Sequence, residues 1–398
     1  MILRILPVLL LTLVLPDVYI LRFHLKTSPR IRWVRSLFLL PTILLMVFSL
    51  YLVSTETNTP RNMDLIVPFF MAYMIIALPK TLFSLVAGTG RCLGSIHHKI
   101  TKASTYIATL MASALCIIML IGFLYGPKHI VVKQQELYLT NLPASFDGYR
   151  VAQFTDLHLA SMQQHHNVVR NMVDSILAYK PNLIAFTGDL VSIESRELNG
   201  FEQELGRLSA PDGVYSILGN HDYAKYARYF TKEEQETDAK TLVKKQEQLG
   251  WKVLKNNHQI IQHKDDSIAI IGVENYGKPP FPQLGDLNKA SEGLHIIKGT
   301  SPSSDKLFKI LLSHDPTHWD AEVVGKTNID LTLSGHTHGM QFMIGGWSPS
   351  ALFYPKWNGV YEHNEQKLHI SLGVGGALIP FRFGAWPEIN IITLRKVE

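Results

Sequence analysis

The sequence predicts an all-α transmembrane leader followed by an α/β domain. Leu, Ile, Met, Val and Phe dominate residues 1–126, whereas the rest of the 398-residue chain has the mixed composition of a soluble domain. In that second part, apolar runs typical of buried strands alternate with segments of helical periodicity. These two observations divide the chain into a leader (1–126), a linker (127–142) and an α/β domain (143–398).

Four apolar stretches of the leader are long enough to cross a bilayer, which takes about 17–25 mostly apolar residues. They run over 5–21, 37–53, 65–87 and 105–125. The first is the weakest because Pro7, Pro16 and Asp17 interrupt it, and the third contains Pro79 and Lys80. A signal peptide is the alternative for the first stretch, but no small-x-small cleavage site follows it. We therefore expect a multi-pass protein of the cell membrane.

Basic residues are distributed unevenly over the loops between these stretches. The second loop has one, Arg61, and the first and third loops together have eight: Arg22, Lys26, Arg30, Arg32, Arg35, Arg91, Lys99 and Lys102. Since loops rich in Lys and Arg stay in the cytoplasm, the first and third loops are predicted to be cytoplasmic. Both chain termini, and the domain after the leader, are then predicted to be extracytoplasmic.

Charge and cysteine content exclude some classes of protein. The net charge of +5 owes much to the membrane loops, so it indicates no nucleic-acid partner. Both cysteines, Cys92 and Cys116, lie in the leader. The α/β domain therefore has no disulfide framework and no thiolate ligand for a metal.

The α/β domain is predicted to contain five strands that each end at a polar block. A short strand is also expected at 131–138 and a helix at 166–179. Residues 231–249 are expected to form a solvated helix or an excursion over the site, and residues 278–304 a long loop or a cap segment. The five strands are predicted at 150–155, 183–187, 213–218, 307–312 and 329–333. In α/β sheets, ligands bind at the carboxyl ends of strands.

The five blocks contain carboxylate, imidazole and amide groups. They are Asp156-Leu157-His158, Gly188-Asp189, Gly219-Asn220-His221-Asp222, Ser313-His314 and Gly335-His336-Thr337-His338-Gly339. These donors suit a pair of ions such as Mn²⁺, Fe or Zn²⁺. Two such ions can hold a phosphate between them and make hydroxide from bound water. Any one of these residues alone is more often a turn, cap or core residue, so it is their joint occurrence that indicates a two-metal phosphoesterase.

In order and residue type, the blocks resemble the calcineurin-like metallophosphoesterase superfamily over about residues 137–392. Within it, the chain looks most like the membrane-anchored bacterial branch related to the YkuE and YaeI proteins. The D-x-H motif at 156–158 and the G-D motif at 188–189 are weak signals of this family when taken alone. The GNHD motif at 219–222 and the GHTHG motif at 335–339, following them in this order, are specific for it. The resemblance implies two mixed β-sheets packed face to face with helices outside, a four-layer α/β/β/α sandwich. It also implies two divalent metal ions (Mn, Fe or Zn) as cofactors.

Carried over residue by residue, the resemblance implies a role for each block. Asp189 would bridge the two ions. The first ion would be held by Asp156, His158 and His338, and the second by Asn220, His314 and His336. His221 would be the catalytic histidine that protonates the leaving oxygen or stabilises charge. Asp222 would orient His221 or a neighbouring loop, and a hydroxide bridging both ions would attack phosphorus.

Other polar residues near the blocks have less support. His165, His166 and His318 are weaker candidates for the site. Arg382 is either a phosphate contact or the partner of Glu388 in a surface salt bridge. Residues 190–193 lack the Arg that follows G-D in protein Ser/Thr phosphatases, which argues against a phosphoprotein phosphatase.

The resemblance implies a membrane-anchored hydrolase of a phosphomonoester or phosphodiester. Because the chain is anchored in a membrane, a lipid-linked or cell-envelope substrate is favoured. Two alternatives stay open. One is a lipid pyrophosphate hydrolase of the UDP-diacylglucosamine type, which works on the cytoplasmic side. The other is a non-catalytic metal-binding membrane protein.

Overall fold

The structure, a computed structural model, describes residues 2–25, 32–54, 63–94, 98–163, 165–227, 229–279, 281–295, 307–377 and 379–397. The chain separates into two compact units, Met1–Tyr125 and Gly126–Glu398. Lys26, Arg30 and Arg61, which entered the topology prediction, lie outside the described residues.

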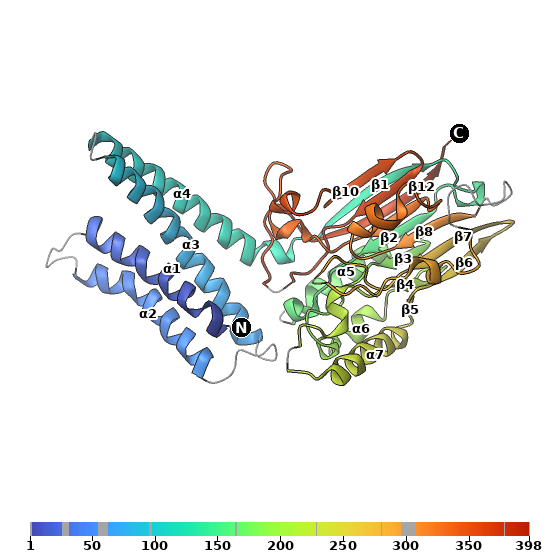
Figure 1. Cartoon of the computed structure of the whole chain (residues 1–398), viewed down its shortest axis with the longest axis horizontal. Helices are drawn as coiled ribbons and strands as arrows, with labels where there is room; N and C mark the ends of the chain where they lie inside the picture. The colour runs from blue at the N-terminus through green and yellow to red at the C-terminus, as the bar shows by residue number, and fades with distance from the viewer. Residues whose placement is uncertain are drawn as a thin grey trace. The chain divides into compact units, whose positions relative to one another are not determined.

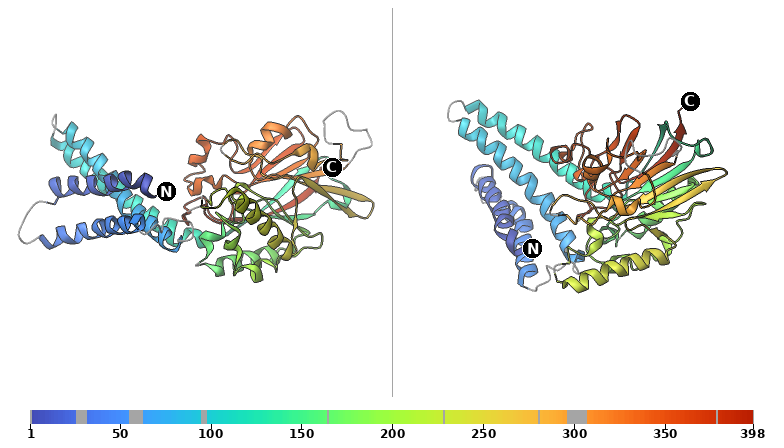
Figure 2. Two further views of the ribbon diagram at one scale, coloured as in Figure 1. Left: turned by 60° about the horizontal axis from the view of Figure 1, so that its bottom comes forward. Right: turned by 45° about the vertical axis from the view of Figure 1, so that its right-hand side comes forward.

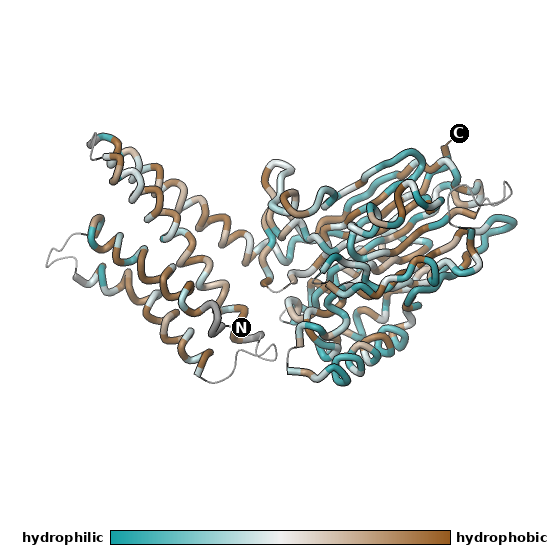
Figure 3. Tube along the Cα trace, viewed as in Figure 1, coloured by the Kyte–Doolittle hydropathy of each residue, from teal (hydrophilic) through white to brown (hydrophobic). Residues whose placement is uncertain are grey.

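Four long helices make up the first unit. They are α1 (Ile2–Phe23), α2 (Arg32–Ser54), α3 (Met63–Leu93) and α4 (His98–Leu124). Figure 3 shows that hydrophobic residues dominate all four. Each contains a stretch long and apolar enough to cross a membrane. The predicted all-α leader is thereby confirmed, and Pro7 and Pro16 lie inside α1 without ending it.

The two charges that interrupt the first and third apolar stretches meet in this unit. Lys80 Nζ on α3 lies 2.8 Å from Asp17 Oδ1 on α1 and 3.0 Å from Thr42 Oγ1 on α2. Asp17 is buried. Because the opposite charge is supplied inside the bundle, both residues can occupy an apolar environment that would strongly penalise either charge alone.

Two six-stranded mixed sheets form the second unit (Figure 1). The first sheet has the order β1-β12-β2-β3-β4-β5, with strands Val131–Leu139, Glu388–Lys396, Arg150–Phe154, Leu183–Phe186, Val214–Ser216 and Lys252–Val253. The second has the order β10-β11-β9-β8-β7-β6, with strands Gly359–His363, Gln366–Ile370, Leu331–Ser334, Phe308–Leu312, Asp266–Gly272 and Asn257–His263. β2, β3 and β4 run parallel, as do β8 and β9, so within each sheet these strands end at the same edge.

Alternating side chains of the strands build three apolar layers around the sheets. On β3, Leu183 and Ala185 face the core between the two sheets, whereas Ile184 and Phe186 pack with α5 (His166–Ala178). The same outer layer includes α6 (Glu202–Leu205) and α7 (Lys232–Gln248), which Figure 2 shows along one side of the sheets. α8 (Leu287–Ala290) packs on the outer face of the second sheet. The predicted four-layer α/β/β/α sandwich is confirmed.

Part of the segment predicted as a linker belongs to the first sheet. β1 lies within 127–142 and pairs in parallel with the C-terminal strand β12, from Val131↔Glu388 to Leu139↔Lys396. The sheet therefore begins almost directly after the first unit, which corrects the boundary placed at residue 143. Within the loop expected at 278–304, the described part contains α8, and residues 296–304 lie outside the described residues.

Candidate metal centre

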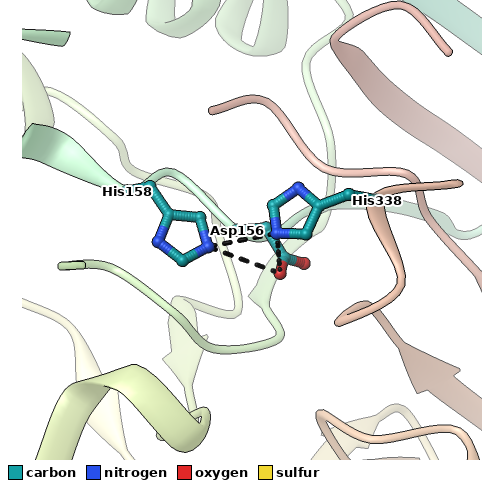
Figure 4. A group of neighbouring side chains, drawn as sticks. All are labelled: Asp156, His158 and His338. Carbon is teal, nitrogen blue, oxygen red and sulfur yellow. Dashed lines mark hydrogen bonds and ion pairs between the residues drawn. The ribbon is translucent and has the colours of Figure 1, made fainter. Parts of the chain in front are cut away.

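The residues that follow β2, β3, β4, β8 and β9 converge at one edge of the sandwich. His338 follows β9 of the second sheet, and its Nε2 lies 3.1 Å from Oδ1 of Asp156, which follows β2 of the first sheet. Figure 4 shows the side chains of Asp156, His158 and His338 pointing toward one another. The site thus forms where the carboxyl ends of strands from both sheets meet, as expected for an α/β domain.

The backbone at this edge is held in conformations that non-glycine residues seldom adopt. Asp156, His158, Asp189, His336 and His338 have φ values of 53°, 43°, 59°, 74° and 50°. Residues in such sparsely populated regions cost about 1–3 kcal/mol each and cluster at functional sites. Five of the seven predicted metal ligands share this feature, which points to a function for the loops that carry them.

The first group of donors consists of Asp156, His158 and His338. The two Nε2 atoms of the histidines face each other at 3.1 Å, and His158 Nε2 lies 3.9 Å from Asp156 Oδ1. Asp156 Oδ1 is buried and has no hydrogen-bond partner, whereas Asp156 Oδ2 accepts from Thr155 Oγ1 and from the His336 N–H. Two facing imidazole nitrogens and an unpaired carboxylate oxygen are an arrangement that a cation would stabilise.

The second group consists of Asp189, His314 and His336. His314 Nε2 lies 3.2 Å from Asp189 Oδ2 and 3.3 Å from His336 Nδ1. His314 Nδ1 donates to the Thr187 carbonyl at 2.8 Å, and His336 Nε2 is bonded to Tyr354 Oη at 2.9 Å. These outer bonds leave His314 Nε2 and His336 Nδ1 facing the group.

Asn220, at the start of η7 (Asn220–Tyr223), completes this side of the site. Its amide Nδ2 donates to Tyr226 Oη at 2.9 Å, and its Oδ1 is buried with no hydrogen-bond partner. A buried amide oxygen that accepts no hydrogen bond carries a desolvation cost, and a cation bound to that oxygen would offset it.

Asp189 lies between the two groups. Its Oδ2 is 3.6 Å from His158 Nε2 and 3.2 Å from His314 Nε2, while its Oδ1 accepts from the His221 N–H at 2.8 Å. This position is the one that a bridging carboxylate would need. All seven predicted ligands therefore lie together at this edge of the sandwich.

Burial and charge set the protonation of these groups. Burial raises the pKa values of Asp156 and Asp189, but the surrounding histidines lower them more, so both carboxyls stay ionised. Burial lowers the pKa values of His158 and His336, which keeps their imidazoles neutral. At His314, burial lowers the pKa but Asp189 and Asp156 raise it to about 10. The centre thus attracts positive charge, and its oxygen and nitrogen donors fit divalent cations.

His221 is oriented toward the same centre. Its Nδ1 lies 2.6 Å from the Ser192 carbonyl and must donate to it, which leaves Nε2 as the nitrogen available for chemistry. The ring stacks on Tyr226 at 4.2 Å between centroids and meets His158 edge-on at 4.8 Å. It lines a cavity of about 370 Å³ together with Asp189, Asn220, His336 and His338.

Asp222 contacts the backbone rather than the His221 ring. Its carboxylate accepts the N–H groups of Asp189, Leu190 and Gly219, each at 2.9 Å, and of Val191 at 3.2 Å. It therefore orients the loop that carries Asp189. Of the two roles predicted for Asp222, these contacts support the orientation of a neighbouring loop.

Arg382 has neither of the roles predicted for it. It is 1% exposed, its Nη1 donates to the His338 and Ala385 carbonyls, and its Nη2 lies 3.0 Å from His338 Nδ1. Glu388, the expected salt-bridge partner, instead pairs with Lys133 at 2.5 Å. These contacts hold the His338 ring with Nε2 toward Asp156.

The supporting residues Tyr226, Tyr354, Ser192 and Arg382 were not assigned these contacts from the sequence. Ser192 and Arg382 act through contacts 29 and 44 residues away, which no local pattern marks. Tyr226 lies only six residues after Asn220, but its type and spacing are not specific for this contact. The weaker histidine candidates lie elsewhere: His166 stacks on Phe201 at 4.2 Å, and His318 is bonded to Ser313 Oγ at 2.8 Å. Among the described residues, neither of these histidines nor His165 belongs to a His/Asp donor group.

Comparison with known proteins assigns both units. Residues 149–340 match the family described as "Calcineurin-like phosphoesterase", and residues 3–127 match the one described as "Probable Calcineurin-like phosphoesterase, transmembrane domain". The uncharacterized metallophosphoesterase YkuE of Bacillus subtilis is 29% identical over 68% of this chain and 88% of its own length. YkoQ of the same organism is 25% identical over 70% of this chain and 96% of its own length.

A relative outside the bacteria shares the same two-part description. The "Transmembrane protein with metallophosphoesterase domain" of Danio rerio is 24% identical over 73% of this chain and 63% of its own length, so the match leaves over a third of that relative uncovered. The family expectation drawn from the five blocks is confirmed. The chain belongs to the calcineurin-like phosphoesterases that carry a four-helix transmembrane domain, and its homologues are metallophosphoesterases of the YkuE and YkoQ type.

Proposed function

We propose that the protein is a membrane-anchored hydrolase of a phosphomonoester or phosphodiester that works with two divalent cations (Mn, Fe or Zn). In this proposal the unit from Gly126 to Glu398 is catalytic, and the four helices anchor it. The observation that carries the proposal is the pair of donor groups that meet at Asp189, each with a buried oxygen or facing nitrogens left for a cation. When bound, the two cations would polarise the phosphate and supply hydroxide from water.

The chain's own residues then divide the remaining work. Asp156, His158 and His338 would hold one cation, and Asn220, His314 and His336 would hold the other. Asp189 would be shared between them. His221 keeps its Nδ1–H on the Ser192 carbonyl and directs Nε2 to the leaving oxygen, to which it donates a proton. The oxygen of water joins phosphorus as the bond from phosphorus to the leaving oxygen breaks, and the proton lost by water replaces the one that His221 Nε2 gives to the leaving oxygen. The products are an alcohol and either inorganic phosphate, from a monoester, or a phosphomonoester, from a diester.

The test uses the full-length protein purified in detergent, stripped of metal and reloaded with Mn²⁺, Fe²⁺ or Zn²⁺ one at a time. We expect metal-dependent hydrolysis of p-nitrophenyl phosphate, bis(p-nitrophenyl) phosphate or both. The ratio of the two rates separates a monoesterase from a diesterase. Folded protein that binds metal and hydrolyses neither substrate nor a lipid pyrophosphate would support the non-catalytic alternative instead.

We propose further that the catalytic unit lies outside the cytoplasm. The argument is the excess of Lys and Arg in the first and third loops of the four-helix leader. Alkaline phosphatase fused after Glu398 should be active, and green fluorescent protein fused there should be dark. The opposite pair of results would place the site in the cytoplasm and favour the UDP-diacylglucosamine type of hydrolase.

A further inference from the structure

Exposed apolar side chains gather in one short segment after the metal-ligand loop. Met340, Ile344, Trp347, Leu352 and Phe353 are between 49% and 73% exposed. In the described part of the second unit, the other large apolar residues with comparable exposure are scattered over distant segments: Tyr138, Ile260, Leu284 and Val397. The five clustered residues are called the apolar ledge.

In this segment hydroxyl groups are buried and apolar side chains are exposed, which is the opposite of a loop that faces water. Its two serines at 348 and 350 are fully buried, and their hydroxyls donate to the Gly339 and Thr337 carbonyls at 2.6 Å and 3.4 Å. The apolar side chains face outward instead. Exposed apolar area costs about 25 cal/mol per Å², so this arrangement is favourable only when an apolar phase covers the outer side.

A tight turn holds part of the ledge in place. The N–H of Ile344 donates to the Trp347 carbonyl at 2.9 Å, and the N–H of Trp347 donates to the Ile344 carbonyl at 3.0 Å. Gly345 and Gly346 between them have φ values of 58° and 80°, which is the type I′ geometry of a two-residue hairpin. The turn sets an aliphatic and an indole side chain opposite each other, and Trp is the residue type that prefers the boundary between apolar and aqueous phases.

The ledge borders the metal centre. Met340 and Phe353 line the same cavity as His336 and His338. Leu352, at the end of η10 (Pro349–Leu352), directly precedes Phe353 and is 73% exposed, but it does not line the cavity. A molecule whose phosphorus lies at the metal centre would therefore have an apolar surface beside it for its remaining part.

We infer that the ledge receives the acyl chains of a bilayer lipid, and that the substrate is a phosphoester of such a lipid. The inference rests on the hydrolase proposed above and names its substrate class. The occupant is argued from the chain itself, because the four-helix transmembrane domain keeps the protein at a bilayer. The reaction is the hydrolysis already described, with water as the second reactant.

The first test compares two diesters that share a p-nitrophenyl leaving group. One is the water-soluble methyl p-nitrophenyl phosphate, and the other is the diacylglycerol ester phosphatidyl-p-nitrophenol in phosphatidylcholine vesicles. The full-length protein is reconstituted with Mn²⁺, and Ile344→Ser, Trp347→Ser and Leu352→Ser are compared with Ile260→Ser. Ile260 is the matched control because it is 48% exposed on the edge strand β6.

We expect each ledge variant to lose about tenfold or more of the lipid rate, the effect of withdrawing one large apolar side chain from lipid. The soluble rate should stay unchanged, and Ile260→Ser should resemble the wild type on both substrates. Equal losses on both substrates, or no loss on either, would overturn the inference. A wild type that hydrolyses only the soluble diester would overturn it too, while leaving the proposed function intact.

The second test does not depend on catalysis. The emission of Trp347 is isolated by subtracting the spectrum of Trp347→Phe from that of the wild type in vesicles of phosphatidylcholine brominated along its acyl chains. We expect the difference emission to be strongly quenched, because the indole lies among the chains. If the wild type hydrolyses no phosphoester, the proposed function fails and quenching alone decides the lipid contact. Difference emission that is unquenched, or that changes with protein concentration as at an interface between two copies of the chain, would overturn the inference.

Discussion

The two units of this protein bury charged groups in opposite ways. In the helical unit, Asp17 and Lys80 neutralise each other at 2.8 Å, and Thr42 takes a second bond from the lysine. Although Asp17 Oδ2 has no hydrogen-bond partner, the pair is balanced charge for charge. In the α/β unit, two carboxylates and several imidazoles crowd together, and the buried oxygens Asp156 Oδ1 and Asn220 Oδ1 are left without donors.

The contrast separates buried charge that stabilises a fold from buried charge that awaits a ligand. A balanced pair needs nothing further, and removing one member exposes the other to an apolar environment. Each buried oxygen that has no hydrogen-bond partner costs about 1–3 kcal/mol of desolvation free energy until a ligand such as a cation binds it. The two units therefore differ in whether their buried charged groups are paired within the chain. Four sets of variants test this difference.

The largest effect is expected from Asp189→Asn. The change removes the charge between the two donor groups, so metal content measured by mass spectrometry should fall well below two ions per chain. Hydrolysis should drop about 10³-fold or more, since several kcal/mol of charge stabilisation are lost. Asp330→Asn is the control, because this buried carboxylate already accepts from Asn141 Nδ2 and from the Lys309 N–H. An Asp189→Asn protein that keeps two ions would show that the bridge is assigned to the wrong residue.

The next largest effect is expected from His221→Ala. The variant should keep its metals and lose about 10²–10⁴ in turnover, the usual contribution of a general acid. His363→Ala, at an exposed histidine of β10, should be silent in both measurements. Loss of metal from His221→Ala would instead make this histidine a ligand, in line with its position within 4.8 Å of the donors of His158 and Asp189.

A smaller effect is expected from Arg382→Gln. The variant loses the guanidinium that orients His338, so metal affinity at the first donor group should fall about 10–100-fold, as for other groups that orient a ligand. Isothermal titration with Mn²⁺ measures it. Arg395→Gln makes the same change at an arginine that pairs with Glu136 on the surface, and it should bind metal like the wild type. Equal affinities for all three proteins would reduce Arg382 to a packing role.

The smallest effect on hydrolysis is expected from Asp17→Asn. The change leaves Lys80 without its counter-charge among the helices, so thermal unfolding in detergent should shift to lower temperature while metal content and turnover stay unchanged. The double variant Asp17→Leu with Lys80→Leu removes both charges and should recover most of the lost stability. A turnover defect in Asp17→Asn would mean that the pair serves the reaction as well as the fold.

Much of the architecture could be predicted because it depends on short-range patterns. The length of the apolar stretches predicts the four helices of the leader, and a short apolar run followed by a polar block predicts each strand that ends at the metal centre. The helix at 232–248 begins at Thr231, whose side chain accepts from the Glu234 N–H in a capping box, another signal of local range. The family resemblance then assigned the seven predicted ligands to one site.

The sequence by itself determined the two-part organisation, the strand-end ligand blocks and the chemical types of the donors. Only the tertiary structure decided which nitrogen of each histidine faces the centre, that Asp222 holds a loop, and that Lys80 meets Asp17. It also decided that the apolar groups of the ledge are exposed while the serine hydroxyls of the same segment are buried. The reason is range: His158 and His338 touch across 180 residues and Arg382 reaches His338 across 44, and contacts of that span arise from packing, which no local pattern records.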